Sequence, residues 1–223
     1  MIVDERFVTY INSLNSGNTA LLDEIEAEAL RTDVPVIRKE TQACLKLLLA
    51  LKMPSRILEV GTAVGFSAIL MKTYNPAPCR ITTIENYAKR IPLARENFRR
   101  AGMEADIELI EGDAADVLEC MEGTFDMVFM DAAKGQYLRF LPQVLRLLKE
   151  GGMLVSDNVL QDGDIIESRY AVIRRNRTIH RRMRSYLYEL THHAQLVTAV
   201  LPVGDGITVS SKKKESSGRP GEK

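Results

Sequence analysis

The sequence predicts an α/β fold: a doubly wound, mostly parallel sheet of seven strands, with helices on both faces and an antiparallel hairpin at the C-terminal end. The first observation behind this prediction is that short apolar runs alternate with segments of helical spacing between residues 53 and 193. The second is that Ile57, Leu58 and Val60 make the kind of run typical of a parallel strand covered on both faces. The third is Gly204-Asp205-Gly206, which joins two final apolar stretches as a hairpin turn would.

The N-terminal part, residues 1–52, is expected to form helices that precede the sheet. Apolar side chains recur at helical spacing over residues 3–31, and Ser16-Gly17-Asn18 interrupts them, so two helices are predicted. Residues 32–37 form an extended connector, because Pro35 disfavours the helical conformation for the residue before it. A third helix leads into the first strand. We expect this part to cover the site or to pair with a second subunit in a homodimer.

The core of a single domain, 1–211, is expected to run from residue 53 to residue 211. Strands are predicted at 57–60, 81–84, 107–110, 125–130, 153–156, 196–203 and 206–210. Helices are predicted at 39–51, from residue 67, and at 89–101, 115–121, 137–148 and 176–193. Gly151-Gly152 should close the helix that begins at 137. Residues 160–175 are polar and irregular, and residues 212–223, which are rich in lysine, glycine and serine, predict a disordered tail.

The bulk composition indicates a single cytoplasmic domain. The chain has 223 residues, of which 45% are hydrophobic, and its formal charge is zero, so it can bury one sizeable core. Its three cysteines have neither an even count nor metal-ligand spacing, as expected of reduced residues in the cytoplasm. No apolar run approaches the roughly 18 to 20 residues that span a bilayer, so no membrane partner is expected.

A glycine turn follows the first strand and predicts a binding site for a nucleotide-like cofactor. Gly61 and Gly65 let the backbone approach a ligand, and the helix from Ser67 points its first N–H groups at the same place. Glu85, at the tip of the second strand, follows at the interval from which an acid reaches a ribose hydroxyl. Ala63 stands at the middle position of the three-glycine dinucleotide fingerprint, which argues against a nicotinamide-dependent dehydrogenase.

Polar side chains also stand at the tips of the later strands. Asp131, Asp157 and Asn158 offer two carboxylates and an amide oxygen, and such hard ligands favour Mg²⁺, or a similar ion such as Mn²⁺ or Ca²⁺, over zinc. Helix capping is the alternative role for each of them. Lys134 lies one tight turn after Asp131, so its amine is a candidate general base beside the metal. Asp113 ends the third strand beside the cofactor turn.

Several segments together resemble one enzyme family. They are Glu59-Val-Gly-Thr-Ala-Val-Gly-Phe-Ser67, Ile84-Glu85, Glu111-Gly-Asp-Ala114, Met130-Asp-Ala-Ala-Lys-Gly-Gln-Tyr137 and Ser156-Asp-Asn-Val159. They look like the motifs of the metal-dependent class I O-methyltransferases, the catechol and caffeoyl-CoA group, in the same order over most of residues 30–211. Within that family the chain most resembles the bacterial branch that includes the tRNA 5-hydroxyuridine methyltransferase. The resemblance implies a Rossmann-like domain that uses S-adenosylmethionine.

The resemblance also implies roles for individual residues. It implies that S-adenosylmethionine is held by Ile37, Glu59, Gly61, Thr62, Gly65, Ser67, Glu85, Asp113, Ala114 and Asp131. Of these, Glu85 would bind the ribose, Asp113 and Ala114 would lie near the adenine, and Asp131 near the methionine amine. It implies that Asp131, Asp157 and Asn158 hold Mg²⁺. Lys134 matches the lysine that acts as base in catechol methylation, so Lys134 and Asp131 are the expected catalytic residues.

One departure from the family bears on the acceptor. Where related enzymes carry an aromatic wall for a flat phenolic substrate, this chain has an arginine-rich stretch, 169–184, and it contains no tryptophan. We therefore expect methylation of the 5-hydroxyl of 5-hydroxyuridine at the wobble position of tRNA, giving 5-methoxyuridine. The expected RNA contacts are Arg169, Arg174, Arg175 and Arg177. A small catechol-like or phenolic acceptor is the alternative, and a non-catalytic RNA-binding module, which would not need the acids or Lys134, is a remoter one.

Overall fold

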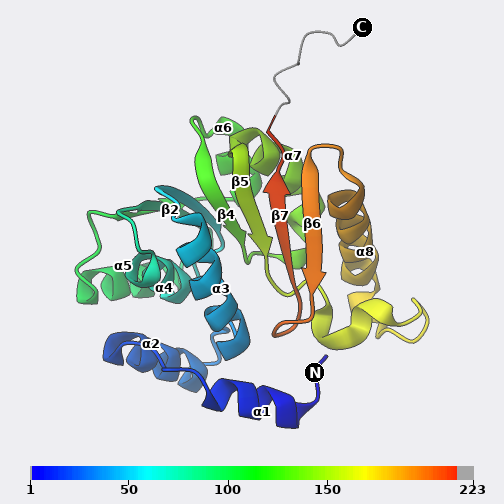
Figure 1. The fold of residues 1–223 in the computed structure, drawn as a ribbon, viewed down its shortest axis with the longest axis horizontal. Coiled ribbons are helices and arrows are strands. Elements are labelled where there is room, and N and C mark those ends of the chain that lie inside the picture. The colour runs from blue at the N-terminus through cyan, green and yellow to red at the C-terminus, as the bar shows by residue number, and fades with distance from the viewer. Residues whose placement is uncertain (1, 215–223) are drawn as a thin grey trace, which may run out of the picture.

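The computed structural model describes residues 2–214, and seven strands in it form one sheet in the order β3-β2-β1-β4-β5-β7-β6. The strands are β1 (Arg56–Val60), β2 (Arg80–Glu85), β3 (Ile107–Glu111), β4 (Phe125–Met130), β5 (Leu148–Ser156), β6 (Leu196–Leu201) and β7 (Ile207–Lys212). β1 to β5 run parallel, whereas β7 is antiparallel to both β5 and β6. The doubly wound sheet with its closing hairpin is therefore confirmed (Figure 1).

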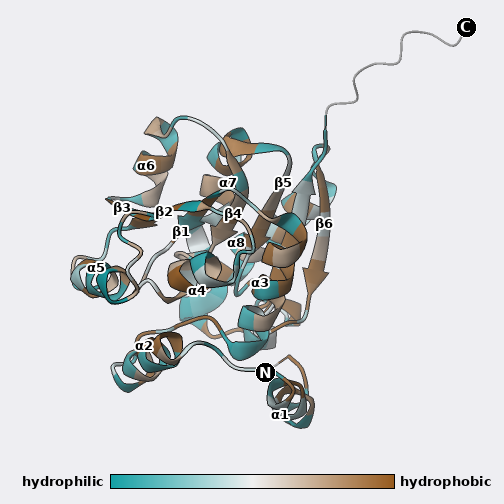
Figure 2. Ribbon diagram, turned by 60° about the vertical axis from the view of Figure 1, so that its left-hand side comes forward, coloured by the Kyte–Doolittle hydropathy of each residue, from teal (hydrophilic) through white to brown (hydrophobic). Residues whose placement is uncertain are grey.

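Helices cover both faces of this sheet. One layer consists of α2 (Ala20–Arg31), α3 (Lys39–Lys52), α4 (Phe66–Tyr74) and α5 (Ile91–Arg100), and the other of α6 (Ala114–Cys120), α7 (Tyr137–Leu147) and α8 (Arg177–His192). Successive residues of β1 serve the two layers, since Ile57 packs into the first and Leu58 into the second. The helices carry both apolar and polar stretches (Figure 2), as amphipathic elements between a sheet and solvent must.

The first helix, α1 (Glu5–Ser13), lies apart from the sheet, near the N-terminal end of α3 (Figure 1). It is tied to α3 by a hydrogen bond of 2.7 Å from Asn12 Nδ2 to Glu40 Oε1. Its apolar side chains Phe7, Tyr10 and Ile11 are exposed, and none of its described residues is buried. The N-terminal helices α1 to α3 match the expected three. Among residues 2–214, no helix combines the length and the apolar character needed to cross a membrane.

The start of β5 differs from the expectation. We predicted that Gly151-Gly152 would end a helix and that the strand would begin at 153, but α7 ends at Leu147 and β5 begins at once at Leu148. Leu148 pairs with Phe125 and Met153 with Met127, so residues 149–152 bulge out of the ladder. The glycines serve this bulge, because Gly151 has a φ of +69° that few other residues adopt.

The last strand, β7, also runs further than expected. It continues to Lys212, which pairs with Leu196 across the hairpin. The Lys212 ammonium donates hydrogen bonds of 2.8 and 2.9 Å to the carbonyl oxygens of Leu145 and Leu148. These contacts explain why a lysine that looks like the start of a polar tail belongs to the sheet. The rest of the predicted tail, 215–223, lies outside the described residues.

Backbone hydrogen bonds beyond the ladders join the tips of neighbouring strands in a row. Gly61 N–H donates to Ile84 O at 3.1 Å, Asp131 N–H donates to Val60 O at 3.0 Å, and Asp157 N–H donates to Met130 O at 2.9 Å. The residues that follow β1, β4 and β5 therefore lie along one edge of the sheet. In doubly wound folds, ligands bind at this edge, where the strand order reverses beside the first strand.

Candidate active site

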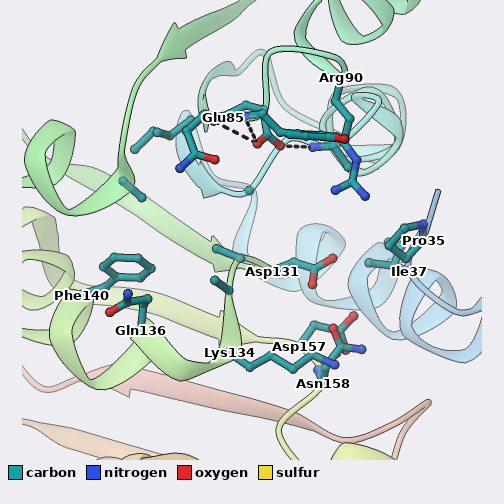
Figure 3. Close-up of a pocket in the computed structure, with 18 of the residues that line it drawn as sticks. Pro35, Ile37, Glu85, Arg90, Asp131, Lys134, Gln136, Phe140, Asp157 and Asn158 are labelled. Carbon is teal, nitrogen blue, oxygen red and sulfur yellow. Dashed lines mark hydrogen bonds between the residues drawn. The ribbon is translucent and has the colours of Figure 1, made fainter. Parts of the chain in front are cut away.

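A cavity of about 700 Å³ lies at the strand-tip edge (Figure 3), which is within the usual range for small-molecule sites. It is lined by nine of the residues that we expected to bind cofactor or metal or to act in catalysis: Ile37, Gly61, Glu85, Asp113, Ala114, Asp131, Lys134, Asp157 and Asn158. The lining comes from the tips of all five parallel strands, β1 to β5, and from the connector before α3. One cavity therefore joins the glycine turn to the acids at the later tips.

The glycine turn after β1 approaches the tip of β4 closely. Gly61 has a φ of +103°, and a Cβ there would lie 2.3 Å from the carbonyl oxygen of Asp131, so the position accepts only glycine. Opposite the turn, Ile37 lines the same cavity, and its carbonyl accepts a hydrogen bond of 2.9 Å from Gln42 Nε2. Gln42 thereby holds the connector before α3 over the turn.

Glu85 is fixed at the tip of β2 by three backbone N–H groups. Its Oε2 accepts from Ala63 N–H at 2.8 Å, and its Oε1 accepts from Asn86 and Tyr87 N–H at 2.9 Å each. A carboxylate offers about four acceptor positions, so one remains on Oε2 for a ligand hydroxyl. Asp113, at the next tip, lines the cavity and also caps α6 by accepting from Ala115 N–H at 2.9 Å.

Replacing Glu85 should weaken cofactor binding strongly. Glu85→Ala removes a charged hydrogen-bond acceptor and also frees Ala63 in the glycine turn. A hydrogen bond to a charged group is worth about 1.5 to 3 kcal/mol, so the affinity for S-adenosylmethionine should fall on the order of ten- to a hundredfold. Calorimetric titration with the cofactor measures this, with the melting temperature as a check on folding. An unchanged affinity would show that the ribose does not bind at this tip.

Four of the expected cofactor residues lie behind the turn rather than in the main cavity. Glu59 is completely buried and accepts hydrogen bonds from the hydroxyls of Ser67 and Thr83. Thr62 shares a hydroxyl hydrogen bond of 2.6 Å with Thr83. A Cβ at Gly65 would lie 2.5 Å from the ring of Phe98. Thr62 and Ser67 border a smaller adjoining cavity, whereas Glu59 and Gly65 support the turn from beneath.

Burial raises the pKa of Glu59 to about 8, against the two hydroxyl donors that lower it. The folded protein therefore keeps a proton that the unfolded chain releases near pH 4.5, and Glu59 destabilises the fold increasingly as the pH rises from about 4.5 to about 8. Glu59→Gln should remove this loss, so its melting temperature should gain on that of the wild type as the pH goes from 5 to 8. A difference in melting temperature between the two proteins that stays constant from pH 5 to 8 would contradict the raised pKa of Glu59.

Asp131, which is half-buried, and Asp157, which is buried, form an acid pair at the tips of β4 and β5. Burial raises the pKa of Asp131 to about 6, although the nearby charge of Lys134 opposes the shift. Burial and the charge of Asp131 raise the pKa of Asp157 well above its ordinary value. Two carboxylates held together away from water favour a bound cation, because a cation removes both their repulsion and their desolvation cost.

Asn158 completes a ligand set that fits a hard divalent cation. Its backbone has a φ of +57°, and its N–H donates to Asp157 Oδ1 at 2.9 Å. Its Nδ2 donates to Asp205 Oδ1 at 2.6 Å, which leaves its amide oxygen for a ligand. Residues 2–214 contain no group of three or more His, Cys, Asp and Glu side chains suited to a metal. The candidate site thus depends on two carboxylates and an amide, a donor set suited to Mg²⁺.

Lys134 begins a short 3₁₀ helix, η1 (Lys134–Gln136), directly after the tip of β4. Its side chain extends along the cavity towards Asp157 and Asn158 (Figure 3). The next residue in the chain after η1, Tyr137, is fully buried, and its hydroxyl lies 3.1 Å from Met130 O and 3.2 Å from Asp157 O. Tyr137 therefore ties the tips of β4 and β5 together.

The arginine-rich stretch divides into two groups. Arg177, Arg182 and Arg184 donate hydrogen bonds to backbone carbonyls, as Arg177 Nε does to Val172 O at 3.2 Å. These three fasten the irregular segment and η1 to α8. The second group has no hydrogen-bond or ion-pair partner within the described chain, and its members are exposed: Arg169, Arg174, Arg175 and Arg181. Of the four expected RNA contacts, Arg177 is thus already bonded to the protein, while the other three have no partner in the described part of the chain.

The structure adds residues that we did not predict from the sequence. Asp205 lines the cavity from the turn between β6 and β7, and Arg38 lines it from the connector before α3. Arg38 Nη2 lies 2.7 Å from Asp162 Oδ1 and 3.8 Å from Asp205 Oδ2. Asp205 stands between two glycines in the sequence, but the predicted hairpin turn accounted for it, so no role in the site was expected.

Comparisons with known proteins agree with this geometry. A family model described as O-methyltransferase matches residues 12–213. A catechol O-methyltransferase of Niastella koreensis is 36% identical over 127 residues, which are 55% of this chain and 58% of that protein. Caffeoyl-CoA O-methyltransferase 2 of Populus trichocarpa is 30% identical over 76% of this chain and 72% of that protein.

A solved structure extends the similarity to the whole fold. The S-adenosylhomocysteine-bound methyltransferase PaMTH1 of Podospora anserina has a TM-score of 0.84 and 27% identity, covering 94% of this chain and 95% of that one. The family model spans most of the chain, and the fold places a cofactor-sized cavity where the glycine turn and Glu85 meet. The chain therefore belongs to the family of S-adenosylmethionine-dependent O-methyltransferases.

Proposed function

We propose that this methyltransferase depends on a divalent ion and methylates the 5-hydroxyl of 5-hydroxyuridine at the wobble position of tRNA, giving 5-methoxyuridine. The observation that carries the metal dependence is the pair of carboxylates, half-buried Asp131 and buried Asp157, in the same cavity as Glu85. The observation that favours RNA is the group of exposed arginines after β5 that have no partner among residues 2–214.

The residues of the cavity divide the work of the reaction. Asp131, Asp157 and Asn158 would hold Mg²⁺, which would lower the pKa of a hydroxyl bound to it and fix its position. Lys134, whose side chain extends along the cavity, would take the proton from the acceptor hydroxyl. The acceptor oxygen then forms a bond to the methyl carbon as the bond from that carbon to sulfur breaks. Glu85 and the glycine turn would hold the adenosyl half in position for this displacement.

The choice of acceptor follows from how a hard cation recognises oxygen. Two adjacent oxygens chelate such an ion, and a 5-hydroxyuridine presents them as its 5-hydroxyl and 4-carbonyl. A catechol presents the same pair. A small phenolic acceptor is therefore the second candidate, and the names of the relatives, a catechol and a caffeoyl-CoA O-methyltransferase, favour it. A tRNA acceptor would place the enzyme in the cytoplasm.

One assay separates these candidates. The protein is incubated with methyl-labelled S-adenosylmethionine and either tRNA that contains 5-hydroxyuridine or a panel of catechols, each with Mg²⁺ and with EDTA. We expect Mg²⁺-dependent label in tRNA at a rate well above that on any catechol. Label in catechols alone would replace the acceptor and leave the reaction class intact, whereas full activity in EDTA would remove the metal from the proposal.

We also propose that the chain is a homodimer. The exposed apolar side chains of Phe7 and Tyr10 in α1, and of Leu14 directly after it, need a cover that residues 2–214 do not supply. Leu47 and Leu51 of α3 are also more than half exposed. A second copy that packs against these helices would bury both groups of side chains. A monomeric mass in light scattering would contradict this proposal.

A further inference from the structure

We infer that Asp205 is a positioning residue for the metal site, because it holds the side-chain amide of Asn158 with its oxygen left free for the ion. The inference rests on the proposed metal-dependent reaction and assigns a role to a residue that contacts neither the reacting hydroxyl nor the methyl group. It is carried by the contact between Asn158 Nδ2 and Asp205 Oδ1, which is 2.6 Å long.

An asparagine needs such a partner before it can serve as a metal ligand. The two ends of its amide have nearly the same shape, but only the oxygen can bind a cation, and the amide turns readily about its last bond. An ionised carboxylate can only accept hydrogen bonds, so it selects the NH₂ end of the amide. Asp205 therefore leaves the amide oxygen of Asn158 to bind the ion that Asp131 and Asp157 would also hold.

The chain holds Asp205 rigidly against Asn158. Val159 N–H donates to Gly206 O at 2.9 Å, and Leu160 N–H donates to Asp205 O at 3.0 Å, so the hairpin turn is fastened to the segment after β5. A Cβ at Gly206 would lie 2.3 Å from Leu160 Cγ. The close packing of this turn explains why glycine follows Asp205, with a φ of +93°.

Arg38 and burial complete the arrangement. The side chain of Asp205 is only 8% exposed, so water has little access to the contact with Asn158. Arg38 Nη2 lies 3.8 Å from the other oxygen, Oδ2, which leaves Oδ1 to Asn158. The same Nη2 lies 2.7 Å from Asp162 Oδ1, and the Asp162 side chain is 55% exposed. Asp162 thus shares the guanidinium of Arg38 with Asp205, but no hydrogen bond between Asp162 and Asn158 is present among the described residues.

These contacts provide a matched pair of variants. Asp205→Ala should lower the affinity for Mn²⁺ or Mg²⁺, measured by calorimetry on the full chain, on the order of ten- to a hundredfold, as is usual when the partner of a metal ligand is lost. Asp162→Ala removes the same charge beside Arg38 and should change metal affinity by less than about twofold. Both variants should bind S-adenosylmethionine like the wild type in the absence of metal. Equal losses of metal affinity in the two variants would overturn the inference.

A double-mutant cycle tests whether Asp205 acts through Asn158. Asn158→Ala should lower metal affinity by itself, and adding Asp205→Ala should then cause no further loss. Losses that add up would show that Asp205 acts through its own charge, which contradicts the inference. Asp205→Asn keeps an oxygen in reach of Asn158 Nδ2 and should recover most of the affinity that Asp205→Ala loses. No recovery would count against the role in the same way.

The outcomes separate this inference from the proposed function. A wild-type protein that binds S-adenosylmethionine but no divalent ion would remove the metal site, and the role of Asp205 with it. A wild type that binds the ion, together with an Asp205→Ala variant of unchanged metal affinity, would overturn the role of Asp205 alone. If Asp205→Ala does not fold, Asp205→Ser takes its place, because a serine hydroxyl is too short to reach Asn158.

Discussion

Asp157→Ala should abolish turnover while leaving the affinity for S-adenosylmethionine within a few-fold of the wild type. Asp157 stands at the tip of β5, whereas the glycine turn follows β1 and Glu85 ends β2, so the substitution removes a proposed metal ligand without touching the cofactor side. Loss of about 4 kcal/mol of stabilisation by the ion corresponds to a fall in turnover on the order of a thousandfold. A turnover assay with Mg²⁺, beside calorimetry with the cofactor, measures the two quantities.

Folding can be checked in the same variant. The carboxylate of Asp157 is buried against that of Asp131, and its removal relieves a repulsion. The metal-free variant should therefore melt no lower than the metal-free wild type at pH 8. Substantial turnover in the variant, or an equal loss of cofactor affinity, would show that Asp157 does not serve a metal.

Reversing the charge of the free arginines should abolish methylation of tRNA and spare small acceptors. Arg169, Arg174 and Arg175 are exposed and have no partner among residues 2–214, so changing them to Glu costs no internal contact. Phosphate contacts release counterions, so the slope of log affinity against log salt should fall by about one for each arginine. We expect RNA methylation to fall on the order of a hundredfold or more, while any catechol methylation stays near its original rate.

The matched control reverses three cations elsewhere. Arg31, Arg80 and Lys213 are exposed, and no described acid pairs with them. Their reversal costs two hydrogen bonds to backbone carbonyls, from Arg31 to Ala27 O and from Lys213 to Ala194 O. Their reversal changes the net charge equally and should leave both the rate on tRNA and its salt slope near the wild-type values. Unchanged RNA activity in the arginine variant would favour a small-molecule acceptor, and equal loss on both acceptors would indicate a folding defect.

Most of the fold could be predicted because its signals are local. Apolar runs such as that around Ile57 and Leu58 determine strands, and the residue that follows each strand determines the edge at which a ligand can bind. The start of β5 could not be predicted, since Gly151-Gly152 marks a helix end and a strand bulge equally well. The end of β7 could not be predicted either, because it depends on hydrogen bonds that the ammonium of Lys212 donates to carbonyl groups of α7 and β5.

The site could be predicted only as far as position along the chain determines contact. The row of strand tips brings Glu85, Asp131 and Asp157 to one cavity, as their places in the sequence suggested. Glu59 was expected to touch the cofactor, but it lies under the turn because it faces Ser67 and Thr83, a contact that depends on packing. Asp205 is 47 residues from Asn158, and such pairing has no signature in a single sequence.

The row of hydrogen-bonded strand tips fixes the spacing of the groups along the cavity edge of the sheet. Neighbouring strands lie about 4.8 Å apart, so the glycine turn after β1, Asp131 after β4 and Asp157 after β5 are offset by roughly one strand spacing each. In the proposed reaction, methyl donor and acceptor would thus be held at a separation set by the pitch of the sheet and not by flexible loops. The irregular segment, residues 160–175, and α8 can then vary in sequence to admit a nucleotide or a phenol without changing the distance that the methyl group travels.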